Sequence, residues 1–102
     1  MLLKAIEDSL FAIVVLTKNY ASSTWCLDEL VKIMGCKEKM GLIVLPIFYD
    51  VEPSVVRKQT ETYAQAFAKH EKLLNKNLKK VHTWQAVLTD VSNLLRWSLE
   101  DR

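Results

Sequence analysis

The sequence predicts an α/β fold with a parallel sheet and flanking helices, and three observations support this prediction. Two continuous apolar runs, residues 11–16 and 42–49, are typical of strands that are covered on both faces. Amphipathic helical patterns lie before and after each run, and this alternation favours parallel strands joined by helices. The chain has 102 residues, of which 50% are hydrophobic, as expected for one small domain with a buried core.

The first half of the chain reads as helix, strand, helix and strand. Apolar residues recur at helical spacing over residues 2–10 and predict a short amphipathic helix before the first strand. A second stripe, over residues 27–34, predicts the helix between the strands, and Gly41 follows where that helix should end. Pro46 lies inside the second strand and lacks an N–H, so this strand is expected at a sheet edge or with a local bulge.

The second half of the chain is predicted to be helical after a turn. Residues 50–54 form a loop or turn at the carboxyl end of the second strand. Helical spacing then predicts one helix, and a longer helix completes the chain. The apolar stripes of these two helices contain Tyr63, Ala66, Phe67 and His70 in the first, and Val81, Trp84, Leu88, Val91 and Leu95 in the second.

Two strands make a poor sheet, because three or more are normally needed for independent stability. The strand at residues 11–16 is apolar enough to be central, yet the pattern offers no strand for its other side. An exposed apolar edge of this kind invites pairing with another chain. We therefore expect this protein not to be a stable monomer, and a two-fold homodimer is the arrangement that this edge favours.

Composition and charge limit the classes of function. The net charge of +2 is too small to indicate a nucleic-acid partner. Cys26 and Cys36 form no CxxC pair and have no histidine at metal spacing, so we expect no metal site but two free, buried thiols in a reducing compartment. No secretory signal and no apolar run of roughly 20 residues is present, so no membrane partner is expected. The chain is interpreted as soluble and cytoplasmic, with the nucleus as the alternative compartment.

The segment from Asn19 to Leu30 carries the most chemical information. It places serines, a tryptophan and a glutamate at the start of a helix that follows a strand, where open α/β folds bind ligands. Trp25 and Glu29 are four residues apart and therefore lie on one helical face. A flat aromatic ring beside an acid can stack on a ligand ring and balance its charge.

Seven collinear blocks, which span most of the chain, resemble plant Toll/interleukin-receptor (TIR) domains. They are LLKAIEDS at 2–9, AIVV at 12–15, KNYASS at 18–23, WCLDEL at 25–30, LPIFYDV at 45–51, PSVVRKQ at 53–59 and AFAKHE at 66–71.

The resemblance implies a flavodoxin-like parallel sheet of the kind found in nucleotide-binding, leucine-rich-repeat disease-resistance proteins. Domains of this family signal by self-association, so other TIR domains are the expected partners. Many members cleave NAD+, which makes NAD+ a candidate substrate, with no other cofactor implied. Carried over by motif, the catalytic residue is Glu29, and Trp25, Ser22 and Ser23 line the nucleotide pocket.

Several positions depart from the family pattern. The strand, helix and second strand that open the family fold have no counterpart in these residues, so the pocket of a single chain would be incomplete. We expect the truncated fold to be completed by dimerisation or strand exchange. Glu61 and Arg96 stand where the family usually has glycine, which alone enters left-handed backbone conformations freely.

Ordinary structural roles remain open beside the functional ones. Glu29 could be a solvated acid at a helix N-terminus, and Trp25 could cover the rim of the core. Ser22 and Ser23 are suited to cap the helix whatever the function. His70 is interpreted as a partly buried structural residue.

Other polar residues favour plain structural explanations. His82 is interpreted as a surface residue, and Asp50, Glu52 and Arg57 as a loop cluster of salt bridges. Five lysines between residues 69 and 80 lack interleaved aromatic residues, as is typical of a solvated face.

Three functions remain in competition. The first is NAD+ glycohydrolase or cyclase chemistry centred on Glu29, within plant innate-immune signalling by TIR–TIR association. The second is a non-catalytic TIR adaptor or decoy that binds other TIR proteins. The third, nucleic-acid binding by the lysine stretch, has the least support, and a failure to bind at low salt would exclude it.

Overall fold

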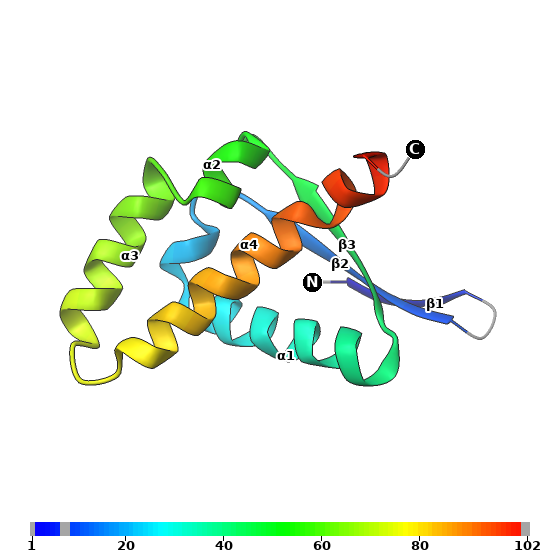
Figure 1. The fold of residues 1–102 in the computed structure, drawn as a ribbon, viewed down its shortest axis with the longest axis horizontal. Helices are drawn as coiled ribbons and strands as arrows, with labels where there is room; N and C mark the ends of the chain where they lie inside the picture. Colours follow the sequence, from blue (N-terminus) through cyan, green and yellow to red (C-terminus); the bar gives the residue numbers. More distant parts are fainter. Residues whose placement is uncertain (1, 7–8, 101–102) are drawn as a thin grey trace.

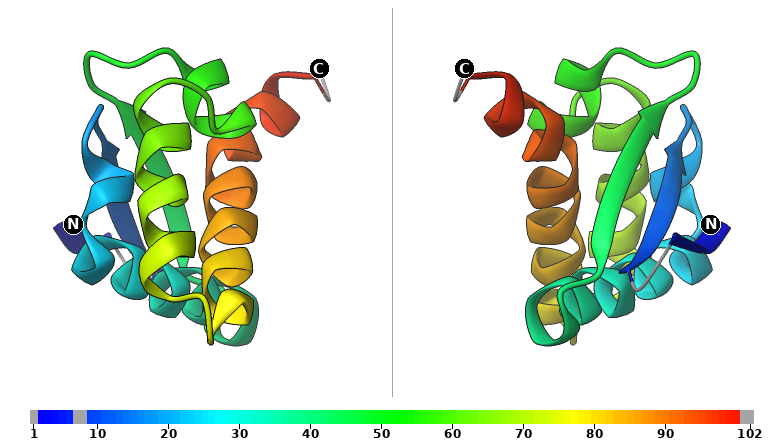
Figure 2. Two further views of the ribbon diagram at one scale, coloured as in Figure 1. Left: turned by 90° about the vertical axis from the view of Figure 1, so that its left-hand side faces the viewer. Right: turned by 90° about the vertical axis from the view of Figure 1, so that its right-hand side faces the viewer.

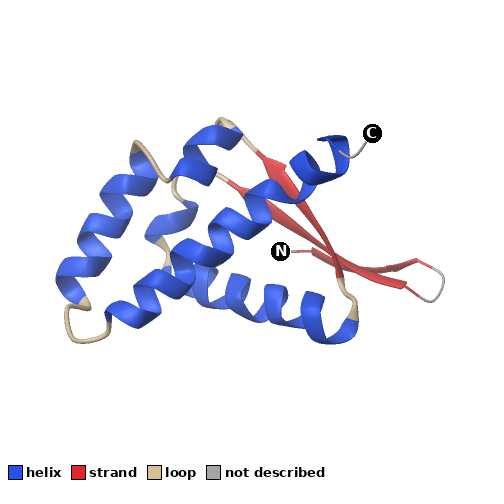
Figure 3. Cartoon of the chain, viewed as in Figure 1, coloured by secondary structure: helices blue, strands red, loops and turns tan. Residues whose placement is uncertain are grey.

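The computed structural model describes the backbone of residues 2–6 and 9–100 and the side chains of residues 10–94. It has the expected α/β architecture, with strands on one side and helices on the other (Figures 1 and 3). The elements in chain order are β1 (Leu2–Ile6), β2 (Ser9–Leu16), a short 3-10 helix η1 (Tyr20–Ser22), α1 (Thr24–Met40), β3 (Ile43–Phe48), α2 (Pro53–Lys58), α3 (Thr62–Leu73) and α4 (Leu78–Glu100).

The described strands form one sheet in the order β1-β2-β3. β2 and β3 are parallel, and their register runs from Phe11 opposite Ile43 to Leu16 opposite Phe48. Pro46 predicted either a sheet edge or a local bulge, and the sheet edge is confirmed, because β3 is an edge strand. A proline is tolerated there, since the missing N–H need not pair with a further strand.

The predicted helix over residues 2–10 is wrong. Residues 2–6 form β1, which pairs antiparallel with β2 from Ile6 opposite Ser9 to Leu2 opposite Ile13. A helix of this length is marginal in water, whereas the edge of β2 offers unpaired backbone groups to a strand. The edge that was expected to stay open is therefore covered over the first five residues of β2, and no described residue pairs with 14–16 on that side.

Helices lie on one face of the sheet and, in the part of the chain that the structure describes, none covers the other, so the prediction of strands covered on both faces is also wrong. α4 lies against β3 with α1 beside it, and α3 packs on η1 and α4. In the right-hand view of Figure 2 no helix crosses in front of β2 and β3. The core lies between the sheet and the helices, and its largest fully buried side chains include Trp84, Tyr63, Leu16, Leu27, Leu30 and Leu88.

The predicted helices α1, α3 and α4 are confirmed by their buried stripes. α1 ends at Gly41, whose φ of 69° is the left-handed conformation that glycine adopts freely. All four stripe residues of α3 are buried, as are Val81, Trp84, Leu88 and Val91 of α4. α4 continues through Arg96 without a turn. No helix among the described residues is long and apolar enough to cross a membrane.

The loop predicted at residues 50–54 ends earlier than expected, because α2 begins at Pro53. Proline is well suited to the first helical position, where no N–H is needed. Six residues are too few for a periodic pattern to reveal the helix. The Gln59 amide nitrogen fixes the end of α2 by donating to the Gln85 carbonyl at 2.7 Å and to Thr89 Oγ1 at 3.1 Å, both on α4.

Glu61, which directly precedes α3, has the backbone conformation of a glycine. Its φ is 53° and its ψ is −122°, and its side chain makes no capping hydrogen bond. The Cβ atom makes this region unfavourable for any residue except glycine. Glutamate therefore occupies a backbone conformation that is suited to glycine.

We expect Glu61→Gly to stabilise the protein. Relief of the backbone strain is worth about 1–3 kcal/mol, and the greater freedom of glycine in the unfolded chain offsets part of it, leaving a gain of about 1 kcal/mol. Urea unfolding at a fixed protein concentration measures the gain. Glu61→Ala is the matched control, because it removes the same carboxylate but keeps the Cβ atom. A glycine variant no more stable than the alanine variant would contradict the strain argument.

Candidate functional site

Two serines at the N-terminus of α1 make different hydrogen bonds. Ser23 is the N-cap of α1, and its Oγ accepts a hydrogen bond from the Cys26 N–H at 3.2 Å. Ser22 does not cap the helix, contrary to expectation, because its hydroxyl donates to the Asn19 carbonyl at 2.6 Å. Both hydroxyl groups are therefore engaged with the backbone that positions the first turn of α1.

His70 holds η1 in place from the neighbouring helix. Its side chain is 7% exposed, and its Nε2–H donates to the Ala21 carbonyl at 2.7 Å. The edges and faces of Phe67 and Trp84 enclose the imidazole, with ring centroids 5.8 Å and 5.2 Å away. The prediction of a structural histidine is confirmed, and His82 is exposed as expected.

Trp25 and Glu29 line the same cavity, which has a volume of about 450 Å³. This volume lies in the range of small-molecule sites. Trp25 is 79% exposed, so it does not cover the rim of the core, while Glu29 is half-buried. The face that the spacing predicted is thus open to a ligand. Ser22 and Ser23 are not among its lining residues.

Five further described residues, which sequence reasoning did not select, also line this cavity. The sequence could have indicated several of them, because they continue the helical face of Trp25 and Glu29 at intervals of three and four residues. The five are Asp28, Lys32, Ile33, Cys36 and Leu42.

The composition of this lining suits a ligand with both apolar and polar parts, as in most binding sites. Among the described residues that line it, all except Leu42 belong to α1.

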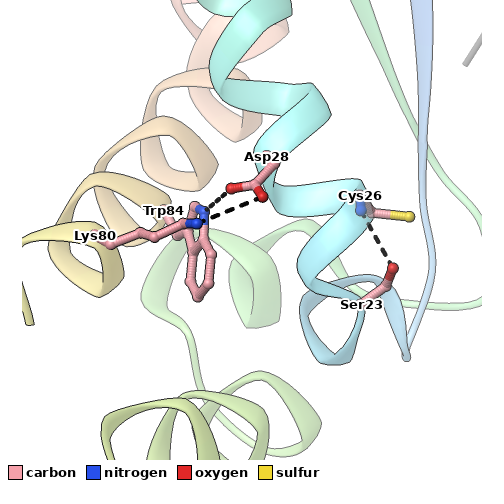
Figure 4. A network of polar contacts seen from close by, with 5 residues as sticks. All are labelled: Ser23, Cys26, Asp28, Lys80 and Trp84. Carbon is pink, nitrogen blue, oxygen red and sulfur yellow. Dashed lines mark hydrogen bonds and ion pairs between the residues drawn. The ribbon is translucent and has the colours of Figure 1, made fainter. Parts of the chain in front are cut away.

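Asp28 connects this wall to α4 (Figure 4). Its Oδ1 accepts from Trp84 Nε1 at 3.0 Å, and its Oδ2 lies 3.6 Å from Lys80 Nζ. The Lys80 ammonium also lies 5.5 Å from the centroid of the Trp84 ring. The five lysines of the polar stretch are exposed, as expected, although Lys80 has this specific partner.

Burial makes the Tyr20 phenol hard to ionise. Its hydroxyl donates to the Cys26 carbonyl at 3.2 Å, and its pKa is raised well above the ordinary value of 10.0, first by burial and then by the charges of Cys26 and Glu29. Tyr20 therefore stays neutral beside the first turn of α1 at physiological pH.

Cys26 and Cys36 are free thiols, but both are half-buried rather than buried as predicted.

A second cavity of about 570 Å³ lies at the carboxyl ends of β2 and β3. Asp50 forms an ion pair with Lys18 at 3.2 Å, not with Arg57, which does not line the cavity. Glu52 and Glu61 add two further carboxylates to the rim. Among the described residues, this cavity is lined by three carboxylates and one ammonium group, whereas the α1 cavity has two carboxylates and one ammonium group, and Asp28 there is paired with Lys80. The cavity along α1 therefore opposes an anionic ligand less and is the better candidate for a nucleotide. No group of three potential metal ligands gathers among the described residues.

The family model described as TIR domain matches residues 1–101. The chain belongs to the TIR domain family. It is 52% identical over 93 residues to TMV resistance protein N of Nicotiana glutinosa and 50% identical over 101 residues to disease resistance protein RPV1 of Vitis rotundifolia. These matches cover 91% and 98% of this chain but only 8% and 7% of the two relatives.

A solved structure gives the same assignment for the fold of this TIR chain. The TIR domains of the activated Roq1 resistosome, which directly recognises the pathogen effector XopQ, match with a TM-score of 0.77 and 57% sequence identity. The match covers 82% of this chain and 51% of that chain. The described fold therefore corresponds to about half of the Roq1 TIR chain.

Proposed function

We propose that this TIR domain acts in plant disease-resistance signalling by associating with other TIR domains, and that its α1 cavity cleaves NAD+ at Glu29. The relatives named as disease resistance proteins support the signalling role. The observation that carries the catalytic part is the shared cavity of Trp25 and Glu29, an exposed aromatic ring and a half-buried carboxylate on one helical face. The cytoplasm is the compartment that this proposal implies.

The proposed reaction breaks the bond between nicotinamide and ribose. The bonding electron pair leaves with the nicotinamide nitrogen, so neutral nicotinamide departs and positive charge develops on the ribose. The Glu29 carboxylate stabilises this charge by its proximity, and Trp25 offers a flat surface on which a ring can stack. A water molecule or ribose hydroxyl then attacks the ribose C1′ atom and releases its proton.

We expect the cavity to support catalysis only within an assembly. Catalysis requires that substrate and catalytic group be held in reacting geometry, and among the described residues α1 supplies all but one of those that line this cavity. Activity is therefore expected to rise steeply with protein concentration, as a second TIR chain closes the site. The same observation supports the second candidate, a non-catalytic adaptor or decoy that only associates with other TIR proteins.

The decisive experiment measures nicotinamide release from NAD+ at increasing concentrations of the protein. Glu29→Gln keeps the shape of the side chain but removes its charge, and we expect it to lower the rate by about a hundredfold or more. Glu38→Gln is the matched control, because Glu38 is an exposed acid on the same helix outside this cavity. It should leave the rate unchanged.

A wild-type rate no higher than that of Glu29→Gln at the highest protein concentration would exclude catalysis and leave the association module. Equal losses in the two glutamine variants would show that Glu29 has no special role.

A further inference from the structure

Lys32 is the one cationic side chain among the described residues that line the α1 cavity. It is exposed, and no ion pair found in the described part of the chain includes it. Asp28, four residues earlier, is the carboxylate that would ordinarily pair with it on a helix. That carboxylate is held instead by Lys80 and Trp84 of α4 (Figure 4). The cavity is thus left with an ammonium group whose charge is available to a ligand.

Three lining residues follow one another along α1 in an order that matches the parts of a nucleotide. Trp25 lies one turn before Glu29, and Lys32 lies about one turn after it on the same face. Each turn rises about 5.4 Å, which is close to the width of a ribose ring. A ribose that carries a flat ring on C1′ and a phosphate group on C5′ would present the ring, the sugar and the phosphate in the same order.

The N-terminus of α1 is the other place where a phosphate group could bind, and it is less suited to one. The Cys26 N–H already donates to Ser23 Oγ, and the Leu27 N–H donates to the Ser23 carbonyl. Neither Ser22 nor Ser23 is among the residues that line the cavity. A helix N-terminus offers only partial positive charge, whereas the Lys32 ammonium carries a full one. The phosphate is therefore favoured at the Lys32 end of the cavity.

We propose that Lys32 binds the phosphate group attached to the nicotinamide ribose of NAD+. The substrate then lies along α1 with its nicotinamide ring at Trp25, its reacting ribose at Glu29 and its phosphate at Lys32. This inference rests on the proposed NAD+ chemistry and specifies how the substrate lies in the same cavity. A lysine binds phosphate as a point charge, so Lys32 is a binding residue and takes no part in bond breaking.

Two probes that differ by one phosphate group test this subsite with residues 1–102. Nicotinamide mononucleotide carries the phosphate and nicotinamide riboside lacks it, and each is titrated into isotope-labelled protein while NMR follows the amide signals of α1. We expect the wild type to bind the mononucleotide about threefold to tenfold more tightly than the riboside. Lys32→Gln should remove this preference, and Lys32→Arg should retain it because the positive charge is kept.

Lys39→Gln is the matched control for the loss of charge. Lys39 is an exposed lysine on the same helix and does not line the cavity. This variant should keep the wild-type preference for the mononucleotide.

Nuclear Overhauser effects in the same samples test the direction in which the ligand lies. Nicotinamide ring protons should show contacts with the Trp25 indole and none with the methyl groups of Ile33 or Leu42, which also line the cavity. Contacts with those methyl groups would show the reverse direction and overturn the proposal.

Three further outcomes would overturn the proposal: neither probe binding at millimolar concentration, a preference retained in Lys32→Gln, or an equal loss in Lys39→Gln. Failure of the catalytic proposal would look different. A preference that depends on Lys32, without nicotinamide release from NAD+, would support the phosphate subsite and reject catalysis. Nicotinamide release with the preference unchanged in Lys32→Gln would reject the subsite alone.

Discussion

Replacing Trp84 with alanine is expected to destabilise the protein by about 3–5 kcal/mol, because the change leaves a large cavity in the core. Trp84 is 1% exposed and is the largest fully buried side chain described. It also joins three elements, since it contacts His70 of α3 and its Nε1–H donates to Asp28 of α1. Small domains have a free energy of unfolding of about 5–15 kcal/mol, so one substitution would remove much of the total.

Trp25→Ala is the matched control for this prediction. It removes the same side chain from the same layer of helices, but Trp25 is 79% exposed. Its effect on stability should stay within about 0.5 kcal/mol. Urea unfolding of both variants at one protein concentration provides the comparison, since self-association adds to apparent stability. Similar losses in the two variants would show that Trp84 is not the anchor of the core.

Burial periodicity explains which parts of the fold could be predicted. The stripes of α1, α3 and α4 are long enough for helical spacing to be unambiguous, and Gly41 marks a true left-handed terminus. α2 is too short to show a period. Residues 2–6 were misassigned because short apolar runs fit a helix and a strand alike, and pairing with β2 decides between them.

The uncovered sheet face could not be predicted from the strands themselves. β2 and β3 are apolar on both sides, which is the usual pattern of strands between two layers of helices. The apolar pattern indicates that both faces of a strand are suited to burial. Whether a helix actually covers a face depends on which other elements are present.

The candidate site was predicted in part. Spacing placed Trp25 and Glu29 on one helical face, and both line the cavity. The different roles of Ser22 and Ser23 depend on the η1 turn, whose geometry no local pattern reveals. The bond between Trp84 and Asp28 joins residues 56 positions apart, so only the folded chain brings them together.

Stability is expected to fall steeply above pH 10 because two buried tyrosines resist ionisation. The pKa of Tyr20 and that of Tyr63 are both raised above the ordinary value of 10.0, in each case chiefly by burial. Above pH 10 the unfolded chain loses these protons while the folded chain keeps them. The unfolded state then binds fewer protons, so the free energy of unfolding decreases by about 1.4 kcal/mol per pH unit for each tyrosine.

The hydrogen bonds of these tyrosines connect this pH dependence to the candidate site. Tyr63 donates to the Thr17 carbonyl at 2.7 Å, and Tyr20 donates to the Cys26 carbonyl in the first turn of α1. A phenolate cannot donate, so ionisation would break both bonds and release the segment that positions Trp25.

Urea unfolding between pH 8 and pH 11 measures this effect in the wild type and in Tyr20→Phe with Tyr63→Phe. The double variant loses two hydrogen bonds and should be less stable at pH 8 by about 1 kcal/mol for each. Its stability should nevertheless fall less steeply above pH 10, because the two titrating groups are gone while all others remain. If the free energy of unfolding fell with pH at the same slope in both proteins, groups other than these tyrosines would govern alkaline unfolding.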